Sequence, residues 1–99
     1  MTTSQVKGLG LTISAREDGT LEAAYVKLSD AKVAKTEVLL EAVVLVDFDR
    51  HGELVGVELL APVSRSTALQ LAKKLKANQR SRFREFFNSD YAPRALVTS

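Results

Sequence analysis

The first forty residues contain three runs that predict strands, and the first run alternates between apolar and polar positions with the period of a half-buried strand. Residues 9–15 place an apolar side chain at every second position, and an Asp-Gly turn leads into a second run at 21–28. A third run, Val33–Leu40, is the weakest strand of the three because Lys35 and Glu37 interrupt it. This half of the chain therefore predicts strands and requires no helix.

The clearest pattern is a hairpin over Ala42–Leu60. Each of its two strands carries a triad of alternating apolar residues, namely Val44, Val46 and Phe48 in the first and Val55, Val57 and Leu59 in the second. Asp49 and Gly52 stand at the first and fourth positions between them, which is typical of a type I turn.

Two registers are open for this hairpin. Pairing both triads on one face places Val46 opposite Val55, whereas a bulge at Gly52 shifts the pairing by one residue and moves one triad to the other face. We favour the first register. In both, the opposite face keeps apolar residues, which are Val43, Leu45, Leu54 and Leu60. A sheet that is apolar on both faces needs two covers, so we expect a partner, most simply a second copy, to supply the cover that one helical segment cannot.

The helical segment follows the hairpin. Its candidate N-caps are Ser64, Ser66 and Thr67. Thr67 and Gln70 also have the spacing of a capping box. An apolar stripe at helical spacing contains Ala68, Leu71, Ala72 and Leu75 and extends to Phe83, Phe86 and Phe87. Arg82 falls inside this stripe, which indicates a break or bend within residues 78–81.

These elements predict an α+β protein with a single domain over residues 1–99. An antiparallel meander of four to five short strands occupies residues 9–62, and one or two C-terminal helices occupy residues 65–88. We expect the remaining segments, 1–7 and 89–99, to be flexible tails.

Composition narrows the class of protein. The chain has no cysteine, which excludes disulfide scaffolds, thiolate zinc sites and cysteine nucleophiles. Its N-terminus lacks the apolar core of a signal peptide, and the longest apolar stretch, Val38–Val46, is interrupted by Glu41. We therefore expect a cytoplasmic bacterial protein that does not enter a membrane.

One segment nearly matches the sequence pattern of a calcium-binding loop. It is Asp47-Phe48-Asp49-Arg50-His51-Gly52, followed by five residues and Glu58. A calcium loop wraps around one ion between two helices, however, and both flanks here are strands. In a hairpin, Glu58 would lie on the order of 10 Å from Asp47, too far to share an ion. We interpret the run as turn chemistry, with His51 solvated at the turn.

No set of residues predicts catalysis. Ser64 and Ser66 are not surrounded by the G-x-S-x-G pattern, the acidic pair at 17–18 lies in a turn, and the chain has no glycine-rich phosphate loop. We therefore predict a protein that is not an enzyme and that uses neither a metal nor another cofactor.

Charge is distributed unevenly along the chain. Residues 1–62 carry 6 basic and 10 acidic side chains, whereas residues 63–99 carry 8 basic and 2 acidic ones, within a net charge of +2. On a continuous helix four basic residues form a stripe beside the apolar face, namely Lys73, Lys76, Arg80 and Arg84. This stripe is a candidate contact for nucleic acid or for an acidic partner. Phe83, Phe86 and Phe87 could stack on bases, but their helical spacing favours burial in a core or an interface, and the cluster is a candidate protein interface.

Two stretches within Asp18–Arg65 carry a resemblance to a known family. One is LEAAYVKLSD at 21–30, and the other is VLVDFD at 44–49 followed by Gly52 and LVGVELL at 54–60. They resemble the bacterial family of domain of unknown function 2283, whose usual short Ala-Ser ending is replaced here by Ala-Pro-Val-Ser at 61–64. The resemblance implies a small β-rich domain without assigned activity. Because genes of this kind can sit beside genes for small toxin-like proteins, it also makes an antitoxin-like partner role conceivable.

We accordingly predict a non-enzymatic module that self-associates or binds a small protein partner. The two-faced hairpin and the phenylalanine cluster favour this function. The alternative is a nucleic-acid-binding regulator that uses the basic C-terminal stripe.

Overall fold

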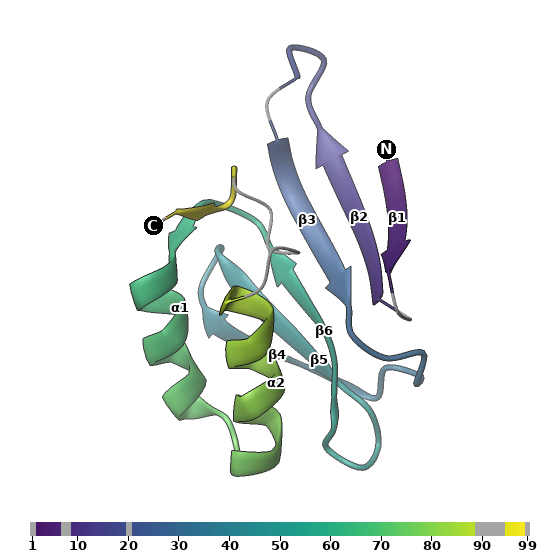
Figure 1. The fold of residues 1–99 in the computed structure, drawn as a ribbon, viewed down its shortest axis with the longest axis vertical. Coiled ribbons are helices and arrows are strands. Elements are labelled where there is room, and N and C mark those ends of the chain that lie inside the picture. The colour runs from purple at the N-terminus through teal and green to yellow at the C-terminus, as the bar shows by residue number, and fades with distance from the viewer. Residues whose placement is uncertain (1, 7–8, 20, 89–94, 99) are drawn as a thin grey trace.

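An antiparallel six-stranded sheet is the main element of the computed structural model, which describes residues 2–6, 9–19, 21–88 and 95–98 (Figure 1). Its strands are β1 (Thr2–Val6), β2 (Leu9–Ala15), β3 (Leu21–Lys27), β4 (Lys35–Leu40), β5 (Val44–Phe48) and β6 (Leu54–Leu59). The helical elements that follow are α1 (Arg65–Leu71), the short 3₁₀ helix η1 (Ala72–Lys74) and α2 (Ala77–Asn88). The α+β class with an antiparallel sheet and C-terminal helices is confirmed.

The strand order, β1-β2-β3-β6-β5-β4, departs from a simple meander. Strand β6 lies between β3 and β5, and β4 lies at the far edge. Side-chain polarity explains this order. Strand β6 is almost entirely buried and needs a neighbour on each side, whereas β4 carries Lys35 and Glu37 and tolerates the solvated edge.

The β5–β6 hairpin places Val46 opposite Val57, so the expected pairing of Val46 with Val55 is wrong by two residues. One residue of the shift comes from the turn, where Asp49 N–H donates to Glu53 O at 3.0 Å. The other comes from an irregularity between Asp47 and Phe48, which makes Val55 an extra residue. Because two single shifts restore the alternation of faces, the first triad still lies on the same face as Val57 and Leu59.

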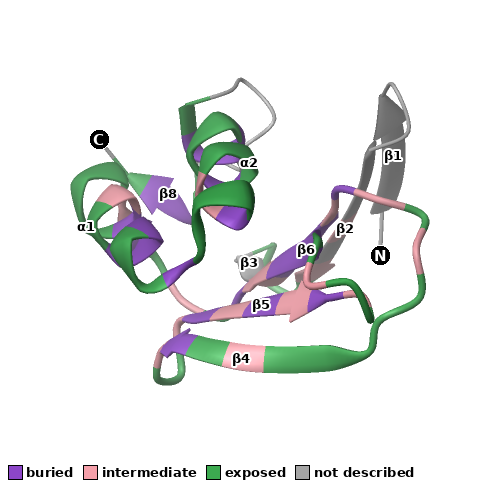
Figure 2. Cartoon of the chain, turned by 90° about the horizontal axis from the view of Figure 1, so that it is seen from below, coloured by how far each residue is buried: buried purple, intermediate pink, exposed green. Residues whose placement is uncertain are grey.

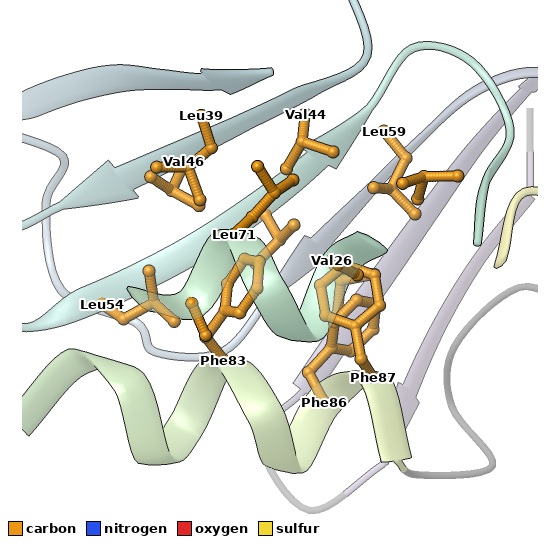
Figure 3. Packing of buried hydrophobic residues seen from close by; sticks show 14 of the residues in the cluster. Val26, Leu39, Val44, Val46, Leu54, Leu59, Leu71, Phe83, Phe86 and Phe87 are labelled. Atoms are coloured by element: carbon orange, nitrogen blue, oxygen red, sulfur yellow. The ribbon is translucent and has the colours of Figure 1, made fainter. Parts of the chain in front are cut away.

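The helices lie over one face of the β3–β6 part of the sheet, and no described element covers the opposite face of that part (Figure 2). Strands β3, β5 and β6 direct apolar side chains into the covered face, among them Val26, Val46 and Leu59, where they meet the helices (Figure 3). The largest side chains that are fully buried there include Val26, Leu54, Leu59, Phe83 and Phe87. Leu54, which we expected on the opposite face, is therefore part of the core.

The helical segment begins at Ser64, whose hydroxyl accepts a hydrogen bond from Thr67 N–H at 3.1 Å. Thr67 thus lies inside the helix instead of opening a capping box with Gln70. The expected break occurs, but earlier than 78–81: Leu75 has an extended backbone with φ −96° and ψ 156°. This break turns Arg82 away from the buried face of α2, and its Nη2 donates to Leu28 O at 2.5 Å.

Both segments that we expected to be flexible tails contain paired strands. In the first, Thr2–Val6 forms β1 against β2. In the second, β8 (Val97–Thr98) pairs in parallel with β7 (Val63–Ser64), and Leu96 is buried. Residues 89–94 lie outside the described residues. The apolar side chains of Leu96 and Val97 explain the ordering of the second segment, because both join the core.

Ser64 and Ser66 provide a matched test of the cap. We expect Ser64→Ala to lower the free energy of unfolding by about 1 kcal/mol, because one helical N–H loses its partner. Ser66→Ala removes an exposed hydroxyl within the first turn and should change stability by less than about 0.5 kcal/mol. Urea unfolding followed by circular dichroism measures both. Equal effects of the two substitutions would contradict the assignment of Ser64 as the cap.

Candidate functional site

The three phenylalanines of the proposed interface lie inside the protein. Phe83 and Phe87 are fully buried and Phe86 is 3% exposed. Their rings pack on one another, with centroids of both Phe83 and Phe86 4.8 Å from that of Phe87 (Figure 3). They form the apolar face that α2 presents to the sheet, so they are core residues in this conformation and not a surface for a partner. The helical spacing of the sequence could not distinguish these two roles.

The four residues of the basic stripe are not brought onto one helix face. Lys73 belongs to η1 and Lys76 to the break, whereas Arg80 and Arg84 belong to α2. Lys73, Lys76 and Arg84 are exposed, but Arg80 is half-buried and donates from Nη2 to Leu75 O at 3.0 Å. The extended residue before α2 thus divides the stripe that a continuous helix would have formed.

The open face of the sheet carries rows of side chains that follow the strand register. One row crosses four strands through Tyr25, Glu58, Leu45 and Val38. The next crosses the same strands through Lys27, Gly56, Asp47 and Thr36. This face is more polar than we expected, because its apolar side chains gather near β4 and polar ones occupy the centre.

A hydrogen-bonded cluster connects three of these strands. The Tyr25 hydroxyl donates to Asp47 Oδ2 at 2.8 Å, and the Thr36 hydroxyl donates to Asp47 Oδ1 at 2.5 Å. To reach Asp47, the Tyr25 ring crosses β6 directly over Gly56, where an added Cβ would overlap the ring and its hydroxyl. Gly56 is therefore needed for close approach and not for an unusual backbone angle.

The surroundings of Tyr25 keep its phenol protonated. Burial raises the pKa of Tyr25 far above its ordinary value, and the hydrogen bond to Asp47 and the negative charges of Asp47 and Glu58 raise the pKa further. A phenol in this state is a hydrogen-bond donor and a poor nucleophile or base. Chemically, the cluster is suited to fixing the strands and presenting a rigid polar surface.

The near-calcium motif forms the hairpin turn that we predicted. Asp49 Oδ1 accepts hydrogen bonds from His51 N–H at 2.8 Å and from Glu53 N–H at 3.0 Å, and Gly52 has φ +79°. These backbone donors, that of Glu53 first, lower the pKa of the Asp49 carboxyl. His51 is exposed, as expected. Among the described residues, no three histidine, aspartate or glutamate side chains gather closely enough to hold a metal ion.

Basic residues that we did not single out from the sequence meet beside this turn. Lys35 from β4, Arg50 from the turn and Lys74 from η1 line one hollow together with Lys76. No sequence motif relates them, because they come from three separate elements. Their proximity is a product of the strand order, which brings β4 and the hairpin turn under the start of α2.

The fold and the open face define a small α+β domain with a sheet that is covered on one side only. Residues 18–61 match the family described as protein of unknown function (DUF2283), which confirms the resemblance over that segment. The segment contains β3 to β6 and the whole Tyr25–Asp47–Thr36 cluster, whereas the helices lie outside it. No curated protein and no solved structure matches the chain significantly. Within the part of the chain that the structure describes, no helix is long and apolar enough to cross a membrane.

Because the Tyr25 ring crosses over Gly56, the effect of Gly56→Ala on the free energy of unfolding should depend on whether Tyr25 is present. Gly56→Ala should lower the free energy of unfolding by about 1–3 kcal/mol, because the new methyl group overlaps the tyrosine ring. In a Tyr25→Ala background the same substitution should be neutral or stabilising, since alanine fits a strand better than glycine. Chemical unfolding of the four proteins measures the cycle. A cost that is the same in both backgrounds would show that the crossing does not constrain residue 56.

The raised pKa of Tyr25 predicts a loss of stability at alkaline pH. The unfolded chain releases the phenol proton near pH 10. The folded chain holds that proton to higher pH. Tyr25 therefore contributes stability that is complete below about pH 10 and is lost progressively above it. The free energy of unfolding, measured between neutral and alkaline pH, should fall less steeply in Tyr25→Phe than in the natural protein.

Proposed function

We propose that this protein is a non-enzymatic module that self-associates through the outer edge of β4. The observation that carries the proposal is the position of β4 at the end of the sheet order, where its described pairing is with β5 alone. Figure 2 shows β4 at the rim of the sheet, with no described helix or strand outside it. An unpaired edge presents a row of amide and carbonyl groups that another strand can complete.

The regular part of this edge is short. Residues Lys35–Val38 pair evenly with β5, and the register shifts between Val38 and Leu40. Beyond Val38 the edge is partly occupied, because Lys74 Nζ donates to Leu39 O at 2.9 Å. Val38 itself is 58% exposed and lies beside Leu45 on the open face. A second strand would therefore pair with residues 34–38.

Strand geometry limits the ways in which two copies can pair there. Along a strand, the residues that direct their amide and carbonyl groups outward alternate with those that direct them inward. Two residues that lie opposite one another across the two-fold axis must both direct these groups outward or both direct them inward. The axis therefore lies midway between the two copies of one residue, and not between two residues that are neighbours in sequence. On the regular part of β4 the axis can pass through Lys35, Thr36 or Glu37.

Charge selects one of these three registers. An axis at Lys35 places two lysines opposite one another, and an axis at Glu37 does the same with two glutamates. An axis at Thr36 places Lys35 of each copy opposite Glu37 of the other and brings Ala34 next to Val38. Opposite charges across a ladder stabilise the pair, and like charges destabilise it. The edge is thus complementary to itself, which favours a second copy over an unrelated partner.

In the isolated chain, the two charged residues of the proposed contact already pair with one another. Lys35 Nζ and Glu37 Oε1 form an ion pair at 2.6 Å, with the two side chains 65% and 39% exposed. In the dimer each side chain would exchange this neighbour for the partner's residue on the same face of a continuous sheet. Because exposed ion pairs contribute little on their own, the backbone hydrogen bonds and the contact at Val38 would supply most of the affinity.

Charge reversal tests both the self-association and its register. Glu37→Lys and Lys35→Glu each place like charges opposite one another, so each variant alone should dimerise about tenfold or more weakly than the natural protein. An equimolar mixture of the two variants restores every opposite-charge pair and should dimerise again. The double variant, which exchanges the two residues, should also recover. Sedimentation equilibrium over about a hundredfold range of concentration measures all five samples.

The experiment distinguishes failure of self-association from failure of the β4 edge as its site. A natural protein that stays monomeric over the whole range would overturn the proposed self-association. Dimerisation that neither single reversal weakens would overturn the β4 edge as its site. Circular dichroism of each variant, compared with that of the natural protein, establishes that the fold is retained.

A further inference from the structure

Two hollows adjoin one another beside the turn of the β5–β6 hairpin. One has a volume of about 440 Å³ and reaches Lys74, Lys76 and Gln79 at the junction of η1 and α2. The other has a volume of about 560 Å³ and reaches Lys32 in the β3–β4 connection. Four residues line both: Ala34, Asp49, Arg50 and His51. The two hollows thus lie side by side at these four residues, and we call them together the turn track.

The turn track is positively charged. Its charged lining residues are Lys32, Lys35, Arg50, Lys74 and Lys76, against Glu37 and Asp49. Both carboxylates are already engaged, Glu37 by Lys35 and Asp49 by two backbone amides of its own turn. Lys32, Lys76 and Arg50 form no ion pair with a described carboxylate, and Lys74 uses one of its three donors on Leu39 O.

The wall of the track is held in place by Gln79. This side chain is 6% exposed, and its Nε2 donates to Gly52 O at 2.7 Å. Its Oε1 accepts from Lys76 N–H at 3.1 Å. One buried amide thus connects the hairpin turn to the backbone that carries Lys76. The cations at the two ends of this connection are consequently placed before any ligand arrives.

We propose that the turn track binds the phosphate backbone of a single-stranded nucleic acid. Cations from four chain segments converge on an open track of the kind that follows a charged polymer, whereas a small metabolite is normally enclosed. A single strand can follow a short track around a turn, which stiff duplex DNA cannot do without a cost in bending. This inference does not depend on the proposed dimer.

The test compares two double charge reversals that change net charge equally. Arg50→Glu/Lys76→Glu alters the turn track, and Lys73→Glu/Arg84→Glu alters exposed residues that line neither hollow. Fluorescence anisotropy with labelled single-stranded DNA of about a dozen nucleotides measures binding at several salt concentrations. The log of the affinity of the natural protein should fall with the log of salt with a slope of about −3, as expected for four neutralised phosphates.

We expect the track variant to bind at least about tenfold more weakly than the natural protein near physiological salt, with a slope about half as steep. The control should lose less than about threefold, because screening limits the effect of charges outside the site. No binding by the natural protein, or an equal loss in both variants, would overturn the proposal. A larger loss in the control would assign binding to the helical residues instead. Tighter binding of duplex DNA, or of a mononucleotide, would overturn the single-stranded assignment.

Lys35 and Glu37 are unchanged in these variants, so failure of the dimer and failure of the turn track are distinguishable. Sedimentation equilibrium of the track variant should match that of the natural protein. Its thermal unfolding temperature, followed by circular dichroism, shows whether weakened binding reflects a loss of fold.

Discussion

The alternation of faces along the β5–β6 hairpin is the constraint on which the rest of the structure depends. The turn adds one residue to the pairing, and Val55 adds another. Either shift alone would have moved half of the apolar residues of the hairpin to solvent. Together they retain Val46 and Val57 on the covered face and leave Asp47 and Gly56 on the open one. Because the two shifts keep the apolar residues of both strands on one face, these residues are buried beneath α2. The same alternation leaves Gly56 on the open face, where the Tyr25 ring crosses β6.

The segment that matches the family model holds strands β3 to β6 with the polar cluster on their open face, but only half of a core. Its covered face is apolar, and the phenylalanines that cover it come from α2, beyond residue 61. The two faces of the sheet thus have different origins along the chain. In the proposed dimer and in the turn track, the matched segment again contributes one side, through β4 and the hairpin turn. The track is completed by Lys74 and Lys76 from the helical part.

Much of this architecture could be predicted from local patterns, and the remainder depends on contacts between distant residues. The turn at Asp49 and the cap at Ser64 could be predicted, since each is satisfied within a few residues. The register could not, because Val55 O accepts a hydrogen bond from Leu28 N–H, which follows β3 in a distant part of the chain. The central position of β6 and the crossing of Tyr25 over Gly56 could not be predicted either, because both depend on the order of the strands in the sheet. A helical stripe of phenylalanines likewise looks the same whether it faces a core or a partner.

The parallel pairing of β7 with β8 has a consequence for the order in which the protein is assembled during synthesis. Val63 pairs with Val97, and Leu96 is buried beside the helices, so residues far apart in the chain complete one core. Translation produces the entire sheet before α2 and produces α2 before Leu96. The apolar face of the nascent sheet therefore stays uncovered until the ribosome has added α2, and the core stays incomplete until it has added Leu96. Throughout that interval the growing chain exposes apolar strands, the kind of surface that makes incompletely folded chains prone to aggregation.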